Sequence, residues 1–350
     1  FIVGAEGVDL TDNSIYRKTA KVVVDASGLA SVIRLNLPIK SYIQREIDLD
    51  DIEVAGRYLL EFDHGAEDET YFDPRYCLIH FDQDLAPGGY AWIFPKGLNK
   101  VNIGLGVKKR SLDIRNAMFK KNDTLKSLMD EHVRRNPVMK NIRLANGDED
   151  RGNEYSTWQV PVRRQNDCLV ANGYAIVGDA AWMPRAIDAG GIGPALNASV
   201  ILGRVVAEAI ESGDWSEGGL WPYNREYMTG YGSQMASFEV LRRFLQNANN
   251  EELNYGMKHY LSYEDVKKIM VREHPSFSKI RLLNPVMFFR ALSHRSLAYG
   301  LLYCAQKHRR FLRIYSEYPD SPDGFTEWQK GLALELNEAY SRFSLQELSK

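Results

Sequence analysis

Two short apolar runs, each ending beside a carboxylate and a glycine, constrain the fold of this chain more than any other feature. Lys21–Val24 leads into Asp25–Gly28, and Tyr174–Val177 leads into Gly178–Asp179. Apolar runs of this length, bounded by turn residues, are typical of strands that are covered on both faces of an α/β sheet. The residues between them have a different, strand-rich character. We therefore expect one α/β sheet assembled from two distant segments of the chain.

The segment between these runs predicts an antiparallel sheet. Strand-like stretches punctuated by glycine occur at Arg57–Phe62, Cys77–Phe81, Tyr90–Phe94 and Val101–Val107, with one helical insertion at Leu112–Arg135. Strands clustered in this way, without a helix between each pair, are typical of antiparallel rather than βαβ organisation.

The two ends of the chain differ in predicted structure. At the start, Ile2–Val3 is strand-like and Leu10–Asn13 predicts a turn. After the second apolar run, a glycine-rich loop is expected to open a helix at about Gly193. From about Leu220 the chain is expected to be helical, with breaks near Pro275, Pro285 and Pro319.

The composition indicates an ordinary folded protein and excludes several classes of partner. Of the 350 residues, 44% are hydrophobic and 26% charged, and the formal net charge of −2 provides no basic field for nucleic acid. None of the three cysteines, Cys77, Cys168 and Cys304, has CxxC spacing, which argues against a metal site and fits a reducing compartment. The sequence still allows one disulfide between two of them. The most apolar helix candidate, Ala195–Ile210, is interrupted by charged residues. We expect neither a membrane span nor a signal peptide.

The segment Tyr174–Gly193 carries the clearest chemical signal. Asp179 follows a buried strand, which places a carboxylate at the carboxyl end of a sheet, where open α/β folds bind ligands. Gly190 and Gly191 then precede a helix, whose amino end offers oriented N–H groups and favours negative charge. A flavin requires an acceptor for its ribityl hydroxyls and donors for its reduced ring, and glycine lets the backbone approach that ring closely. The alternative is an ordinary strand, loop and helix with a capping aspartate.

Motif matches connect these features with a known superfamily. Asp25–Gly28, followed by Ser31 and Arg34, resembles the strand-end motif of the group A flavoprotein oxidoreductases, and Gly178–Asp179 resembles their second flavin motif. Within that superfamily, Pro87–Gly97 resembles the YxWxFP motif of the geranylgeranyl reductases. Further matches are Val160-Pro161, Arg163-Arg164, Leu241–Gln246 and Asn254–Lys258, so the resemblance spans essentially the whole chain.

The resemblance implies a mixed α/β fold (α+β overall), in which a split FAD-binding Rossmann-like domain is interrupted by an antiparallel substrate domain. Residues 1–38 and 167–212 would form the FAD-binding domain, residues 39–166 the substrate domain, and residues 213–350 a C-terminal helical domain. The residues implied to contact FAD are Ala26, Gly28, Gly178, Asp179, Gly190, Gly191 and Ile192. Those implied to contact the substrate are Tyr90, Trp92 and Phe94.

The activity implied by the resemblance is FAD-dependent saturation of isolated double bonds in the geranylgeranyl chains of archaeal ether lipid precursors. The implied partners are the prenyl ether lipid, an electron donor (ferredoxin, NAD(P)H or a reduced deazaflavin) and a membrane surface contacted peripherally from the cytoplasm. Two alternatives stay open. One is an FAD-dependent monooxygenase or halogenase of the same superfamily, and the other is a non-catalytic prenyl-lipid-binding protein without the nucleotide segment.

The chain departs from the family pattern in two places. It lacks the GxGxxG unit that opens such FAD-binding domains and does not begin with Met, so we expect roughly a hundred further residues upstream. In the flavin loop, Ala186 takes the position of the usual proline, Pro184 lies two residues earlier, and Asp188–Ala189 replaces Thr-Gly or His-Gly. Asp188 is therefore a candidate proton donor, with a solvent-facing helix cap as the alternative.

The aromatic strand allows one geometric prediction. Tyr90, Trp92 and Phe94 alternate along a strand and therefore share one face. A hairpin turn at Gly97–Lys100 would pair Trp92 with Leu105, giving one bulky apolar face that lines a tunnel. The opposite face would be nearly bare and would carry Gly104 and Gly106. The alternative is that the aromatic residues are simply sheet core.

Overall fold

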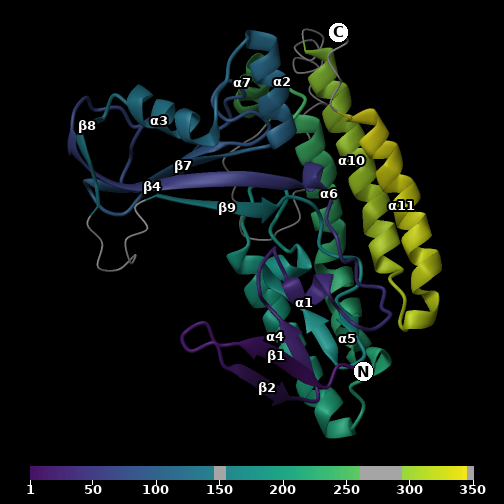
Figure 1. Ribbon diagram of the computed structural model, residues 1–350. Coiled ribbons are helices and arrows are strands. Elements are labelled where there is room, and N and C mark those ends of the chain that lie inside the picture. The colour runs from purple at the N-terminus through teal and green to yellow at the C-terminus, as the bar shows by residue number, and fades with distance from the viewer. Residues whose placement is uncertain (146–154, 261–293, 345–350) are drawn as a thin grey trace. The chain divides into compact units, whose positions relative to one another are not determined.

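The computed structural model describes residues 1–145, 155–260 and 294–344 (Figure 1). The chain divides into two compact units, each assembled from segments that are far apart in the sequence. The first, here called the α/β unit, comprises Phe1–Asp51, Pro161–Arg243 and Ala298–Phe343. The second, here called the sheet unit, comprises Ile52–Val160 and Phe244–Leu297 with the C-terminal residues of the chain.

The central sheet of the α/β unit joins the two apolar runs. Strand β3 (Val23–Asp25) pairs in parallel with β11 (Tyr174–Ile176), which pairs in turn with β10 (Val170–Ala171), so that Ile176 lies opposite Asp25. The predicted assembly of one sheet from two distant segments is confirmed. The prediction that the first run is covered on both faces is wrong for Val24, which is 45% exposed, because β3 lies at the edge of the described strands.

The chain enters the α/β unit through a two-stranded hairpin. Its strands are β1 (Gly4–Val8) and β2 (Ile15–Thr19), which are antiparallel and joined by the expected turn. The strand expected at Ile2–Val3 begins instead at Gly4. The short helix α1 (Val32–Leu35) follows β3 and completes the first segment of this unit.

Helices form the rest of the α/β unit. In chain order they are η2 (Gly178–Ala181), α4 (Ile192–Ser212), α5 (Glu217–Tyr227), the π-helical η3 (Met228–Gly232), α6 (Ser233–Leu245), α10 (Arg295–Ser316), η6 (Pro322–Gly324) and α11 (Phe325–Arg342). α10 and α11 lie side by side (Figure 1), where Lys307 of α10 binds Glu335 and Glu338 of α11. By length and composition alone, α4 is apolar enough to cross a membrane, a test that core helices of soluble proteins also pass. The breaks expected near Pro275 and Pro285 lie outside the described residues.

The sheet unit is built on a six-stranded sheet with the order β5-β6-β7-β4-β8, in which β9 also pairs with β4. Every described pairing on the path from β5 to β8 is antiparallel, as predicted. The strands are β4 (Ile52–His64), β5 (Leu78–His80), β6 (Ala91–Pro95), β7 (Lys100–Val107), β8 (Met139–Leu144) and β9 (Tyr155–Pro161), with η1 (Leu49–Asp51) just before β4 and α7 (Asn250–His259) later in the chain.

The predicted helical insertion consists of two helices rather than one. α2 (Lys109–Phe119) ends at Lys120, which adopts a left-handed conformation. α3 (Leu125–Arg135) then begins with a capping box, in which Thr124 and Ser127 each accept a hydrogen bond from the other's backbone amide. The two caps explain the break, because they end one helix and start the next within a few residues.

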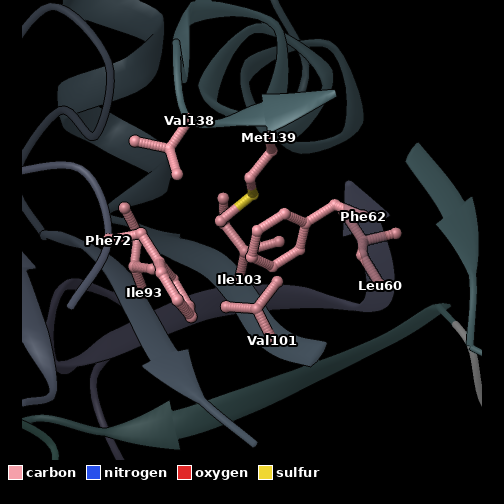
Figure 2. Close-up of a cluster of buried hydrophobic side chains, with 8 residues drawn as sticks. All are labelled: Leu60, Phe62, Phe72, Ile93, Val101, Ile103, Val138 and Met139. Carbon is pink, nitrogen blue, oxygen red and sulfur yellow. The ribbon is translucent and has the colours of Figure 1, made fainter. Parts of the chain in front are cut away.

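One face of this sheet holds the hydrophobic core of the unit. Figure 2 shows one cluster on that face, formed by Leu60, Phe62, Phe72, Ile93, Val101, Ile103, Val138 and Met139. A second cluster joins the same face to α2 and α3 and is formed by Leu85, Ala86, Ala91, Leu105, Val107, Leu112, Leu128 and Met129. Burying a large apolar side chain of this kind contributes about 1.5–3 kcal/mol, so this face supplies the main stability of the sheet unit.

The register between β6 and β7 differs from the prediction by one residue. Trp92 pairs with Gly104, not with Leu105. Because side chains alternate along a strand, a one-residue slip moves every side chain of β7 to the other face. The expected bulky and bare faces are therefore wrong. Leu105 lies on the core face with Ala91, and the aromatic residues share their face with Gly104 and Gly106.

The three cysteines are free thiols, so the disulfide that the sequence left open does not form. Cys77 is exposed, whereas Cys168 and Cys304 are buried. Burial raises the pKa of each buried thiol to about 12, which keeps both protonated at neutral pH. These two side chains therefore act as small apolar core residues.

Candidate functional site

Asp25, at the carboxyl end of β3, is a buried carboxylate whose oxygens are both occupied by donors. Oδ1 accepts from the amide of Ser27 at 2.9 Å and from its hydroxyl at 2.6 Å. Oδ2 accepts from the hydroxyls of Ser31 at 2.6 Å and Tyr174 at 2.8 Å. Burial alone would raise the pKa of Asp25, but these donors hold it below its ordinary value. Asp25 therefore anchors the loop after β3 to β11.

Arg34 connects the first motif to the second. Its guanidinium group, in a residue only 1% exposed, donates to three backbone carbonyls, one of which is Ala180 O in η2. The guanidinium carbons of Arg34 and Arg163 lie 4.9 and 4.6 Å from the ring centre of Trp182. Cation–π contacts of this kind stabilise a desolvated stack. Arg34 thus fixes the turn that carries Asp179, a role that the motif match alone did not reveal.

Asp179 lies in the first turn of η2, immediately beyond β11, and its carboxylate has no hydrogen-bond partner among the described side chains and amides. Burial raises the pKa of Asp179 because no donor compensates for the lost water. A Cβ atom placed on Gly191 would stand 3.3 Å from Asp179 Oδ1, so the start of α4 approaches this carboxylate closely. The structure therefore brings together Asp179 and the glycine-lined helix start.

The surroundings of Asp179 fit a bound flavin. The N-cap residue of α4 is Gly191, which has no side chain to bind the first amides of the helix, and these amides can therefore face an anionic ligand. Gly28, with φ of +84°, has open space where a side chain would stand, and Ala26 beside it is exposed. Ile192 is 82% exposed. An unpartnered acceptor, an uncapped helix start and open backbone are what a ribityl chain and its ring require.

Asp188 is held in an ion pair within the loop before α4. Arg185 Nε contacts Oδ1 at 3.0 Å and Nη2 contacts Oδ2 at 2.6 Å, while the Gly190 amide donates to Oδ1 at 3.0 Å. The guanidinium balances the negative charge that the sequence places here, and the role of Asp188 as a proton donor stays a prediction. A Cβ atom at position 190 would stand 2.7 Å from Arg185 Nη2, so a larger residue there would displace the end of this arginine side chain.

The predicted substrate residues lie in the sheet unit, on the face opposite the hydrophobic core. Phe81, Tyr90, Trp92 and Phe94 form a continuous row with successive ring centres 5.9 to 6.1 Å apart. Tyr90, Trp92 and Phe94 are half-buried, and none belongs to either core cluster. The interpretation of these aromatic residues as sheet core stays a prediction. Their assignment to the substrate stays a prediction.

A buried ion network accounts for the arginine-rich motifs. Arg164 binds Asp167 at 2.9 Å and Glu239 at 3.2 Å, and Arg242 binds Asp51 at 2.7 Å. Burial opposes ionisation of Glu239, but Arg164 and other nearby guanidinium groups hold its pKa well below the ordinary range. These contacts join all three segments of the α/β unit's chain, since Glu239 also accepts from Tyr340. The acidic members were missed from sequence because nothing in the spacing pairs them with particular arginines.

Comparison with known proteins agrees with these features. Residues 51–148 match the model of the geranylgeranyl reductase catalytic domain. Across 97% of this chain and 70% of the relative, the sequence is 29% identical to digeranylgeranylglycerophospholipid reductase of Sulfolobus acidocaldarius. These matches make the chain similar to the geranylgeranyl reductases over most of its length. A second reductase of the same name, from Methanothrix thermoacetophila, is 33% identical over 72% of this chain and 57% of its own length.

Two solved structures share the fold of this chain. A geranylgeranyl bacteriochlorophyll reductase-like protein from Thermoplasma acidophilum superposes with a TM-score of 0.60 at 25% identity, covering 75% of this chain and 62% of that protein. A flavin-dependent brominase shares the fold with a TM-score of 0.52 at 15% identity, covering 84% of this chain and 66% of its own. The chain thus spans about three fifths to seven tenths of these relatives' lengths.

Proposed function

We propose that this protein is an FAD-dependent reductase that saturates isolated double bonds in the geranylgeranyl chains of isoprenoid ether lipid precursors. The observation that carries the proposal is the unpartnered carboxylate of Asp179 beside the uncapped start of α4, in a chain that matches the model of the geranylgeranyl reductase catalytic domain. The names of the relatives supply the lipid, and the fold shared with a flavin-dependent brominase supports the flavin.

In this proposal the α/β unit holds the cofactor. Asp179 would accept hydrogen bonds from ribityl hydroxyls, and the first amides of α4 would stabilise negative charge on the reduced flavin. The open backbone at Ala26 and Gly28 admits the rest of the cofactor. Arg34 keeps η2 in place by donating to Ala180 O. Bound reduced FAD would supply the hydride and the proton that saturate the alkene, and would itself be oxidised to FAD.

The sheet unit is proposed to bind the prenyl chain along the aromatic row. An isolated alkene offers no hydrogen bond, so its position must come from the shape of an apolar surface. Each methylene buried contributes about 0.8 kcal/mol, which makes a long prenyl chain a strong ligand for such a surface. The half-buried row from Phe81 to Phe94 provides aromatic surface that the hydrophobic core does not use.

The remaining partners follow from this activity. An electron donor (ferredoxin, NAD(P)H or a reduced deazaflavin) must regenerate the reduced cofactor. Because the substrate is a membrane lipid precursor, we place the protein in the cytoplasm, in peripheral contact with the membrane.

The decisive experiment is anaerobic incubation of the protein, produced from its complete gene, with FAD, dithionite and digeranylgeranylglyceryl phosphate. Mass spectrometry should show a gain of about two mass units for each bond saturated. A product that appears only with oxygen and gains a hydroxyl group would instead identify a monooxygenase. Lipid binding without any conversion would identify a binding protein.

The role of Asp179 is tested by flavin retention. Asp179→Ala should weaken FAD binding about tenfold or more, because it removes a charged hydrogen-bond acceptor. Asp12→Ala, in the exposed hairpin turn, removes the same charge far from α4 in sequence and should bind FAD normally. Equal FAD affinity for Asp179→Ala and the unaltered protein would refute the site.

A further inference from the structure

The indole of Trp92 is fixed by two residues of the neighbouring strand. Trp92 Nε1 donates to Asn102 Oδ1 at 2.9 Å. A Cβ atom on Gly104 would stand only 2.5 Å from Trp92 Cζ2 and 2.9 Å from Cε2. The same edge of the indole therefore meets both residues, and the ring leans from β6 across β7. Absence of a side chain at 104 is what makes room for it.

The held indole is the centre of the aromatic face. It stacks on Phe94 with an interplanar angle of 26° and a ring-centre distance of 5.9 Å. On its other side Trp92 pairs with Ile79 of β5, which is 37% exposed. Ile79, Trp92 and Gly104 thus form a row across three strands, on the face that lacks the core clusters.

The close approach at Gly104, where a Cβ atom would meet the backbone oxygen of Gly56 at 2.2 Å as well as the Trp92 indole, is not shared by the next glycine on the same face. Gly106 occupies the same face two residues further along β7, yet a Cβ atom there would approach nothing nearer than 3.4 Å. The core face carries Ile93 and Ile103 opposite each other without polar anchoring, and both are fully buried. A hydrogen bond to a half-buried indole is thus a local device that orients one ring.

We propose that Asn102 and Gly104 are positioning residues that hold the Trp92 indole flat as the floor of the prenyl-chain site and thereby set its selectivity for chain length. This inference rests on the proposed function. A tryptophan side chain has only two rotatable bonds, and the hydrogen bond and the adjacent backbone remove most of their freedom. A rigid ring binds most tightly a prenyl chain whose shape matches it, whereas a mobile ring binds short and long chains with similar affinity.

The test compares binding of geranylgeraniol and farnesol to the complete protein, followed by tryptophan emission, with the ratio of the two Kd values as the readout. Asn102→Leu removes the acceptor at nearly constant volume and should reduce this ratio about tenfold. Asn102→Asp retains an acceptor oxygen and should keep the unaltered ratio. Loss of general stability would weaken both ligands together and would leave the ratio unchanged.

A matched glycine pair tests the second contact. Gly104→Ala should displace the indole, lower the selectivity ratio and change the near-ultraviolet circular dichroism of tryptophan. Gly106→Ala should do neither, because space exists for its methyl group. Since a Cβ atom on Gly104 also meets Gly56 O at 2.2 Å, this variant can fail to fold, and the Asn102 pair then decides alone.

A double-mutant cycle separates positioning from other effects. In a Trp92→Phe background, Asn102→Leu should have no further effect on the ratio, because the indole N–H is gone. An unchanged ratio in Asn102→Leu alone, or an equal loss in Asn102→Asp, would overturn the inference. If the unaltered protein binds neither alcohol, the proposed lipid substrate is wrong and this inference falls with it.

Discussion

Replacing Arg34 by methionine is predicted to destabilise the α/β unit by about 3 kcal/mol. Arg34 donates three charge-assisted hydrogen bonds to backbone carbonyls and lies against Trp182. Each bond contributes about 1.5 kcal/mol and the cation–π contact about 1 kcal/mol or more. Removing a buried charge returns part of that sum, because burial disfavours the guanidinium and lowers the pKa of Arg34. The net loss is therefore smaller than the sum of the contacts.

The assay is urea denaturation combined with hydrogen exchange of the segment from Gly178 to Trp182. Arg34→Met should lower the free energy of unfolding and expose the amides of η2, since Ala180 O loses its donor. Arg34→Lys keeps the charge but not the planar fork of donors, so it should fall between methionine and the unaltered protein. A loss below about 0.5 kcal/mol for Arg34→Met, with unchanged exchange in η2, would refute the reasoning.

Two further predictions concern single residues. Burial lowers the pKa of His132 to about 4, so between about pH 6.5 and pH 4 the unfolded chain binds one proton more than the folded chain. The free energy of unfolding should therefore fall by about 3 kcal/mol as the pH drops from about 6.5 to about 4. His132→Gln should flatten the dependence of the urea midpoint on pH, measured from about pH 7 to about pH 4. An unchanged profile in that variant would exclude His132 as the cause. Ala189 has φ of +54°, a left-handed conformation that costs alanine about 1–2 kcal/mol. Glycine adopts this conformation without that cost but loses more entropy on folding. Ala189→Gly should therefore raise the free energy of unfolding by about 0.5–1 kcal/mol. A lower melting temperature for that variant would contradict this account of the loop.

The parts of the fold that sequence could predict are those fixed by local pattern. The two apolar runs predicted one sheet because a buried strand must be apolar along its whole length, and β3 and β11 pair as expected. Alternation placed Tyr90, Trp92 and Phe94 on one face for the same local reason. The closeness of Asp179 and Gly191 could be predicted because one residue follows a strand, the other precedes a helix, and one short loop joins them.

The failures arise where a single residue or a distant partner decides the geometry. The β6–β7 register depends on how many residues the hairpin loop contains, and Pro95 pairs with Val101, one position from the expected partner. That slip was enough to exchange the faces of β7. Arg34 and Ala180 lie 146 positions apart, so the hydrogen bond between them has no signature in either motif. The exposed Val24 likewise reflects which strands flank β3, which its own residues do not encode.

The sheet of the sheet unit separates stability from recognition between its two faces. Truncating Ile103, which is fully buried on the core face, to alanine leaves a cavity and should cost about 2–5 kcal/mol. Trp92, next to Ile93 on β6, points to the opposite face and is only half-buried, so part of its surface is not covered by the hydrophobic core. A large aromatic residue held at a half-buried position by its own hydrogen bond contributes less to folding than an equally large core residue. The surface of Trp92 that the described residues leave uncovered is the reason for proposing the aromatic face as the lipid site.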